Sequence, residues 1–144
     1  MGSLHMERQL KGPFFTQEPP SRVDFLNEIG ARIICRADGY PKPQIHWQGS
    51  DNKIVTNVEN FRTVLINSTL ILLPFKPAAY RQDIHSASMR CVASNAVGAI
   101  RSRDIQVRAG KTLFFGIFPF IIFSFIVFAN SGYELESLVR CSVM

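Results

Sequence analysis

Hydrophobic and polar residues alternate along short runs of this chain, and turn-forming residues separate the runs at intervals of about eight to twelve residues. Alternation with a period of two is the pattern of a β-strand that buries one face. In the run 31–37, alternation places Ile33, Cys35 and Ala37 on one face, which we assign to the core. Because no patterned run shows a helical period, the sequence predicts an all-β domain of two packed sheets.

The other predicted strands are equally short. They span residues 14–18, 23–26, 44–48, 61–66, 69–73, 87–94 and 99–108, with a weaker strand near 54–56 and a crossover loop at 74–83. Pro19 and Pro20 separate the first two, because proline cannot donate a hydrogen bond to a sheet. This number and spacing of strands is typical of a sandwich.

The end of the pattern predicts two local features. Residues 95–98 (Asn-Ala-Val-Gly) form a short link between two strands, which indicates a hairpin turn. In the strand that follows, the apolar positions change parity between Ile100 and Ile105. One extra residue in a strand produces such a change, so we predict a β-bulge near Asp104.

Cys35, Trp47 and Cys91 stand in the order and spacing of an immunoglobulin sandwich. Cysteines that point inward from the second and sixth strands can meet if two sheets pack face to face about 10 Å apart. We therefore predict a disulfide between Cys35 and Cys91, with Trp47 in the core beside it. Two free core thiols are the alternative.

Several motifs give a closer resemblance. They are Gly12-Pro-Phe-Phe, Glu18-Pro, Arg22-Val-Asp-Phe, Gly30-Ala-Arg-Ile, Cys35-Arg-Ala-Asp-Gly39, Pro41-Lys-Pro-Gln-Ile, Tyr80-Arg-Gln-Asp-Ile-His85, Asn95-Ala-Val-Gly98 and Ser102-Arg-Asp-Ile-Gln-Val-Arg108. Through them, residues 12–110 resemble the first immunoglobulin domain, of the I-set type, in the arthropod Down syndrome cell adhesion molecule family. The resemblance implies a multidomain, homophilic neuronal receptor of the plasma membrane, with this domain outside the cell, that acts in axon guidance and dendrite self-avoidance.

Met89 departs from the pattern of such domains, which place a tyrosine two residues before the second cysteine. The tyrosine hydroxyl closes the neighbouring corner with a hydrogen bond. Methionine fills the same core volume but cannot make that bond. We therefore expect a buried Met89 and a turn at 82–86 that is less stable by about 1 kcal/mol.

The predicted function is cell-surface recognition through a homophilic contact. Its partner is another copy of the same receptor, or neighbouring immunoglobulin domains of a longer chain. Complementary patches supply specificity in such contacts, and Arg90, Arg101 and Arg103 form the candidate binding surface. Two alternatives stay open: a structural spacer without a direct partner contact, and a truncated gene-model fragment.

The C-terminal residues differ in composition from the domain. Residues 113–129 include seven phenylalanines and no charge. As a helix they would extend about 26 Å, close to the roughly 30 Å of a bilayer core, which makes them a candidate transmembrane segment. However, the basic residues before this run would place the domain in the cytosol by the positive-inside rule, in conflict with a disulfide. The alternative is that residues 111–144 are translated intron.

Residues 1–11 are predicted to be an N-terminal extension. They lack the apolar core of a signal peptide, so we expect the true start, with such a peptide, to lie upstream. Cys141 has no partner in the predicted domain. The net charge of +5 is spread along the chain, which favours a solvated basic surface over a specific site for acidic glycans or lipids.

Asn67-Ser68-Thr69 is an N-glycosylation sequon in a predicted turn, so Asn67 is the candidate glycosylation site. The histidines and cysteines lack zinc-site spacing. Nucleophile turns, phosphate-binding glycine loops and the aromatic and basic pattern of nucleic-acid readers are absent from the sequence. We therefore expect no enzyme activity, no cofactor, no metal and no nucleic-acid partner.

Overall fold

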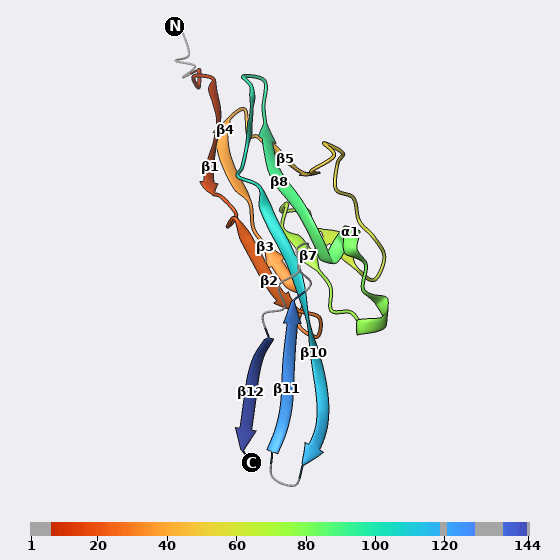
Figure 1. Ribbon diagram of the computed structural model, residues 1–144. Coiled ribbons are helices and arrows are strands. Elements are labelled where there is room, and N and C mark those ends of the chain that lie inside the picture. Colours follow the sequence, from red (N-terminus) through yellow and green to blue (C-terminus); the bar gives the residue numbers. More distant parts are fainter. Residues whose placement is uncertain (1–6, 119–120, 129–136, 144) are drawn as a thin grey trace, which may run out of the picture.

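The computed structural model describes residues 7–118, 121–128 and 137–143, and the side chains of residues 7–110. Figure 1 shows two β-layers packed face to face. The strands are β1 (Lys11–Gln17), β2 (Arg22–Leu26), β3 (Ala31–Ile33), β4 (Arg36–Tyr40), β5 (Gln44–Gly49), β6 (Arg62–Val64), β7 (Leu70–Leu72), β8 (Ser86–Ser94), β9 (Ala99–Arg101), β10 (Ile105–Phe118), β11 (Ile121–Phe128) and β12 (Ser137–Val143). Two short helical turns, η1 (Pro77–Ala79) and α1 (Gln82–His85), lie between β7 and β8.

One layer contains the first half of the sandwich. Strand β1 pairs antiparallel with β4, and the order β3-β7-β6 forms the rest of this layer. Strands β3 and β4 are two parts of the predicted run 31–37, interrupted at Ile34 and Cys35. Gly30 begins this path with a φ of 76°, and a Cβ there would meet the Leu72 carbonyl oxygen, so glycine is required at that turn.

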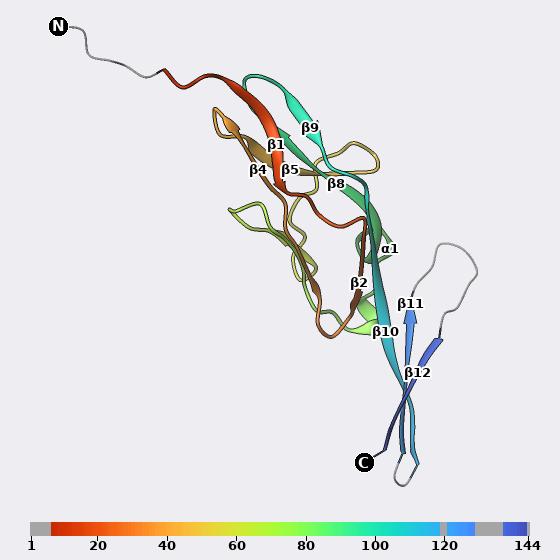
Figure 2. The ribbon, with the colours of Figure 1, turned by 90° about the vertical axis from the view of Figure 1, so that its left-hand side faces the viewer.

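The second layer contains β5, β8 and β10 in antiparallel order, with β9 also paired to β8. Strand β2 pairs with β10 in parallel (Figure 2). Strands β1 and β2 are the two parts of the first predicted strand, and they lie in different layers. The segment with Pro19 and Pro20 connects them. This confirms the split that the two prolines predict.

The core lies between the layers and follows the predicted alternation. Its largest fully buried side chains include Trp47, Ile33, Leu70, Leu72, Ile84, Met89, Ile105 and Val107. Ala37 and Ala93 are also buried, as their strand parity predicts. Each buried aliphatic or aromatic side chain of this kind contributes roughly 1.5–3 kcal/mol through the loss of water contact.

The predicted β-bulge is confirmed between β9 and β10. Along this edge the partners on β8 step back by three residues, from Val92 to Met89, while the opposing chain advances by four, from Arg101 to Ile105. One extra residue is therefore accommodated beside Asp104. The crossover loop differs from the sequence prediction, because it contains η1 and the start of α1.

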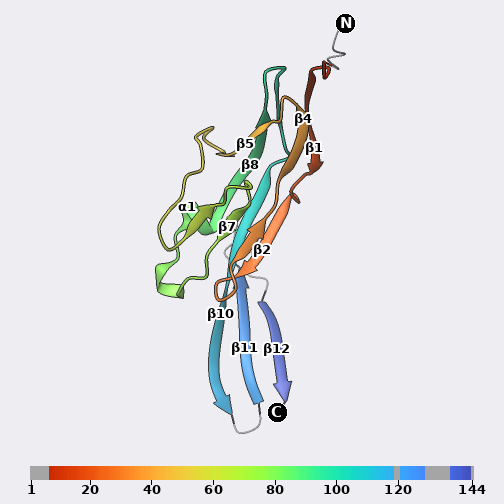
Figure 3. The same ribbon diagram turned by 180° about the vertical axis from the view of Figure 1, so that it is seen from behind.

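The structure has β-strands, not the expected transmembrane helix, in the described part of residues 113–129. Residues 113–118 continue β10, and residues 121–128 form β11, which pairs antiparallel with β10 and with β12 (Figure 3). Phenylalanine and isoleucine are enriched in strands, which agrees with this pairing. Among the described residues no helix has the length and apolar character to cross a membrane.

The predicted start of the domain at Gly12 lies next to the beginning of a strand, whereas the predicted end falls in the middle of one. Strand β1 begins at Lys11, and the predicted end at Gly110 lies inside β10. Residues 1–6 of the expected N-terminal extension lie outside the described residues. Cys141 pairs along the backbone with Phe123 in the ladder between β11 and β12.

Candidate recognition surface

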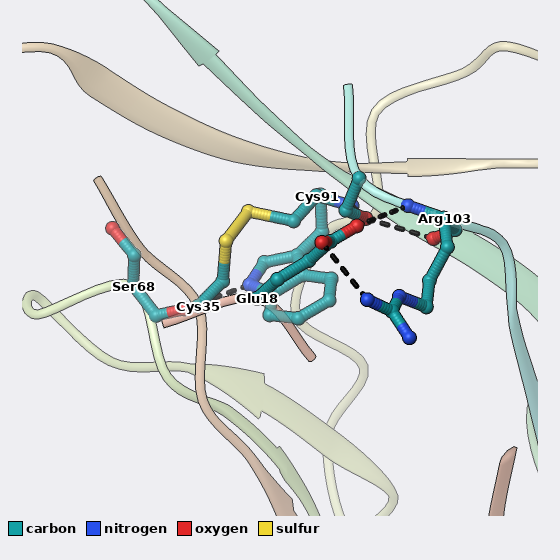
Figure 4. Close-up of a disulfide and its surroundings, with 7 residues drawn as sticks. Glu18, Cys35, Ser68, Cys91 and Arg103 are labelled. Atoms are coloured by element: carbon teal, nitrogen blue, oxygen red, sulfur yellow. Dashed lines mark hydrogen bonds and ion pairs between the residues drawn. A yellow bond between two sulfur atoms is a disulfide. The ribbon is translucent and has the colours of Figure 1, made fainter. Parts of the chain in front are cut away.

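The predicted disulfide is present between Cys35 and Cys91. The two Cα atoms lie 6.5 Å apart, and both residues are fully buried (Figure 4). Trp47 lies directly opposite Cys91 in the ladder between β5 and β8 and is 1% exposed. Its indole Nε1–H donates a 2.7 Å hydrogen bond to the Ser68 carbonyl oxygen. The disulfide and the indole therefore fix the two layers and the turn at Ser68 relative to each other.

Met89 is 2% exposed, so its predicted place in the core is confirmed. The turn at 82–86 is closed by a hydrogen bond to His85 that was not predicted from the sequence. His85 Nδ1 accepts a 2.8 Å hydrogen bond from the Arg81 backbone N–H, and its ring stacks on Phe75 with centroids 3.7 Å apart. His85 therefore takes part of the role that a tyrosine at position 89 has in related domains. A histidine at the end of an irregular loop gives no sequence signal for this role.

The outer face of the second layer carries several charged side chains, and Arg90 and Arg101 of the candidate binding surface are among them. Ladder partners place the following side chains on this face, which we call the charged face: Arg22, Asp24, His46, Gln48, Ser88, Arg90, Val92, Arg101, Gln106 and Arg108. The inner face of the same strands is the apolar core. Strand alternation thus separates the packed face from a mainly polar outer face, on which Val92 alone of the residues named is buried.

Polar contacts hold the side chains of the charged face in place. Asp24 accepts hydrogen bonds from Arg22 Nε at 2.7 Å and from Arg108 Nε at 3.0 Å. In the neighbouring rows, Gln106 Nε2 donates to Ser88 Oγ at 3.1 Å. Pairs of this kind on an exposed surface contribute little to stability, and their clearer effect is to order the side chains.

The three arginines of the candidate binding surface have different surroundings. The Arg90 side chain is 22% exposed and forms an ion pair with Asp104, with 3.1 Å between Nε and Oδ1. Arg101 is exposed at the end of β9 and makes no ion pair with the described residues. Arg90 and Arg101 share the charged face, and Val92 lies beside Arg101 in the ladder.

Arg103 lies outside this ladder, in the link between β9 and β10. Its guanidinium and its backbone N–H both bond the Glu18 carboxylate, at 3.1 and 2.8 Å (Figure 4). The side-chain hydrogen bond from Arg103 lowers the pKa of Glu18. The contact between Glu18 and Arg103 was not predicted from the sequence, although the position of Glu18 directly before two prolines marks the point where the chain leaves the first layer.

The described residues contain no group of three or more histidine, cysteine, aspartate or glutamate side chains placed to share a metal ion. The sequon Asn67-Ser68-Thr69 lies in the turn between β6 and β7, where Asn67 is exposed. That turn belongs to the first layer, whereas the charged face belongs to the second.

Two mainly antiparallel layers joined by a buried disulfide next to a tryptophan define an immunoglobulin domain. Cell adhesion molecule Dscam2 of Drosophila melanogaster is 50% identical over 103 residues, which are 72% of this chain and 5% of that protein. Cell adhesion molecule DSCAML1 of Homo sapiens is 34% identical over 96 residues, 67% of this chain and 5% of that protein. No protein-family model matches the chain.

Solved structures agree with these relatives. The N-terminal four immunoglobulin domains of Dscam1 isoform 7.44 match with a TM-score of 0.73 and 41% identity, over 75% of this chain and 28% of that one. The chain belongs to the Dscam family of cell adhesion molecules, as an immunoglobulin domain. It spans about 5% of the length of the curated relatives it matches.

Proposed function

We propose that this domain is an extracellular recognition module of a Dscam-type adhesion receptor in the plasma membrane, and that it binds another copy of the same receptor. The fold, the disulfide and the family membership support this proposal. We further propose that the domain has no catalytic role and that its receptor acts in neuronal wiring, in axon guidance and dendrite self-avoidance. The resemblance to the first domain of the arthropod receptors suggests the position farthest from the membrane.

The charged face is the part of the domain that we assign to recognition. The single observation that carries this assignment is Arg101, which is exposed on β9 at the end of an otherwise ordered polar sheet face and has no ion pair among the described residues. Asp24 and the flanking arginines keep neighbouring side chains fixed before a partner arrives. A surface that is already ordered loses less conformational freedom on binding.

Bead aggregation with the secreted chain tests this function, and Arg101→Glu is its most direct variant. Because Arg101 has no internal ion pair among the described residues, its reversal should change recognition without a large change in stability. Arg90→Glu and Arg103→Glu would place a second carboxylate near Asp104 and Glu18, respectively. These two variants therefore need a parallel measurement of the free energy of unfolding.

Arg32→Glu is the matched control, because Arg32 is an exposed arginine on β3 in the other layer. We expect Arg101→Glu to reduce aggregation and Arg32→Glu to leave it unchanged. Equal effects of the two reversals would attribute the loss to net charge and remove Arg101 from the binding surface. A strictly monomeric chain at high concentration in analytical ultracentrifugation, with no bead aggregation, would contradict homophilic binding and favour a spacer.

A further inference from the structure

The turn between β6 and β7 combines exposed apolar side chains with the sequon. Ile66 is fully exposed, Leu65 is 39% exposed, and Asn67 follows them directly. A cover over these two side chains would remove apolar surface from water, which is favourable. The charged face lies on the other layer, so the proposed recognition contact leaves this turn uncovered.

A groove of about 410 Å³ opens beside this turn. Its lining includes Arg36 of β4, Lys42 and Ile45 near the start of β5, and Ile66 and Asn67 of the turn. Asp38 also lines this groove, so the Asn67 side chain adjoins a cavity that is part apolar and part charged, with both signs of charge. Any group attached to that side chain begins at the mouth of the groove.

The turn is held by hydrogen bonds that leave the Asn67 amide nitrogen unused. Asn67 Oδ1 accepts a 3.2 Å hydrogen bond from the Thr69 N–H, whereas Nδ2 makes no hydrogen bond to the described residues. The Ser68 N–H donates to the Leu65 carbonyl oxygen at 2.9 Å, and the Ser68 carbonyl oxygen accepts from the indole of Trp47. A substituent on Asn67 Nδ2 thus breaks no hydrogen bond among the described residues.

We propose that Asn67 carries an N-linked glycan whose first sugars cover Leu65, Ile66 and the mouth of the groove. In the transfer, Nδ2 loses one proton and bonds the anomeric carbon of an oligosaccharide, while the pyrophosphate of its lipid-linked donor leaves. Thr69 is 2% exposed in the folded domain, so the glycosyl-transferring enzyme must recognise its hydroxyl before β7 packs into the sandwich. The proposal rests on the extracellular location in the proposed function.

The first test secretes residues 1–144 behind an added signal sequence and measures the intact mass before and after N-glycosidase treatment. We expect one glycan, absent from Asn67→Gln. Secreted chain without this mass difference overturns the proposal. Bead aggregation is scored separately: because the turn and the charged face lie on different layers, Asn67→Gln should leave aggregation intact, so either proposal can fail alone.

The second test asks whether the glycan covers the turn. Hydroxyl-radical footprinting with mass spectrometry should show severalfold more oxidation at Leu65 and Ile66 in Asn67→Gln than in the glycosylated chain. Ile29, which is 71% exposed and distant in sequence, is the internal control and should not change. Equal oxidation at Ile66 with and without the glycan overturns the proposed cover.

A relocated glycan provides the matched control. Ile54→Thr completes a sequon at Asn52, an exposed asparagine in another turn. In the Asn67→Gln background, this variant keeps a glycan on the chain but moves it. We expect Ile66 to stay as accessible as in Asn67→Gln alone. Protection of Ile66 by a glycan at Asn52 would show a general effect of glycosylation and overturn the specific cover.

Discussion

His85 is a titratable side chain placed inside an aromatic cluster. Its ring is fully buried, stacks on Phe75, and lies 5.5 Å from the ring centroids of Phe61 and Tyr80. Because Nδ1 accepts the Arg81 N–H, the neutral ring carries its proton on Nε2, which has no hydrogen-bond partner among the described residues. Protonation of Nδ1 would remove that acceptor and place a charge among the aromatic rings.

Burial lowers the pKa of His85; the charge of Asp83 opposes this shift, and the charge of Arg81 adds to it. The unfolded chain therefore binds the proton more readily than the folded domain. The contribution of neutral His85 to stability is full above the unfolded pKa of about 6.5 and is lost as the pH falls below it. The expected slope is at most about 1.4 kcal/mol per pH unit for this single group.

Urea unfolding between pH 7.5 and pH 5 tests this expectation. His85→Phe keeps an aromatic ring in the stack but cannot ionise, so its free energy of unfolding should depend less on pH over this range. At pH 7.5 the variant should be less stable than the parent, because the Arg81 N–H loses its acceptor. The same slope in both proteins would contradict the assignment to His85.

Trp47 combines core packing with a hydrogen bond that fixes a distant turn. Trp47→Phe keeps an aromatic ring but removes the donor to Ser68 and leaves a cavity beside the disulfide. We expect a loss of about 2–4 kcal/mol in the free energy of unfolding, measured by denaturant titration. Amide exchange should rise at Ser68 and Thr69 first. A loss of stability without faster exchange at the turn would mean that the hydrogen bond has no part in fixing it.

At the scale of elements, the β-bulge between β9 and β10 depends on Ser102. Its hydroxyl accepts a 2.9 Å hydrogen bond from the Cys91 N–H and donates a 2.8 Å bond to the Arg103 carbonyl oxygen. Ser102 is 8% exposed, so water cannot readily replace its hydroxyl as the partner of the Cys91 N–H and the Arg103 carbonyl oxygen. The side chain thereby satisfies backbone groups on both sides of the irregular position.

Ser102→Ala should therefore cost about 1–3 kcal/mol, because it leaves the Cys91 N–H buried without its partner. Ser88→Ala is the control: Ser88 is only partly buried and its hydroxyl bonds the exposed amide of Gln106. The control should change the free energy of unfolding by less than about 0.5 kcal/mol. Similar losses for both serines in urea unfolding would show that the bulge has no special dependence on Ser102.

The elements that the sequence predicted well are those with strict alternation. The inner positions Ile33, Cys35 and Ala37 are buried, and Trp47 faces Cys91, because a period of two leaves a strand one choice of inner face. The change of parity near Asp104 likewise has one simple cause, an extra residue in the strand. At the candidate site, this alternation also places Arg90 on the outer face, whereas the next residue, Cys91, is on the inner face.

Features that arise from contacts between distant segments could not be predicted in this way. The Glu18 to Arg103 pair joins positions 85 residues apart, and the bond from Trp47 to Ser68 depends on how β5 meets the turn after β6. Helical turn α1 is too short to show a period. The sequence predicts a strand for the start of β10 but a helical span for residues 113–129, because a long apolar run has no alternation that distinguishes a strand from a helix.

At the scale of the whole molecule, the bond between Cys35 and Cys91 is the one disulfide that cross-links the two layers among the described residues. The bond closes a loop with a sequence separation of 56 residues. In the chain-entropy model, such a loop restricts the unfolded chain by about 4 kcal/mol. Small domains have a total stability of about 5–15 kcal/mol, so the bond accounts for a large fraction of it.

Replacement of both Cys35 and Cys91 by alanine should lower the free energy of unfolding by about 4 kcal/mol or more, because the cavity beside Trp47 adds to the lost constraint. The measurement is guanidinium unfolding in a Cys141→Ser background, which excludes non-native pairing with the third cysteine. In the same background, a reductant should shift the parent toward the variant and leave the variant unchanged. A parent whose unfolding midpoint does not move on full reduction would show that packing alone joins the layers, and the argument for folding in an oxidising, extracellular pathway would lose its main physical support.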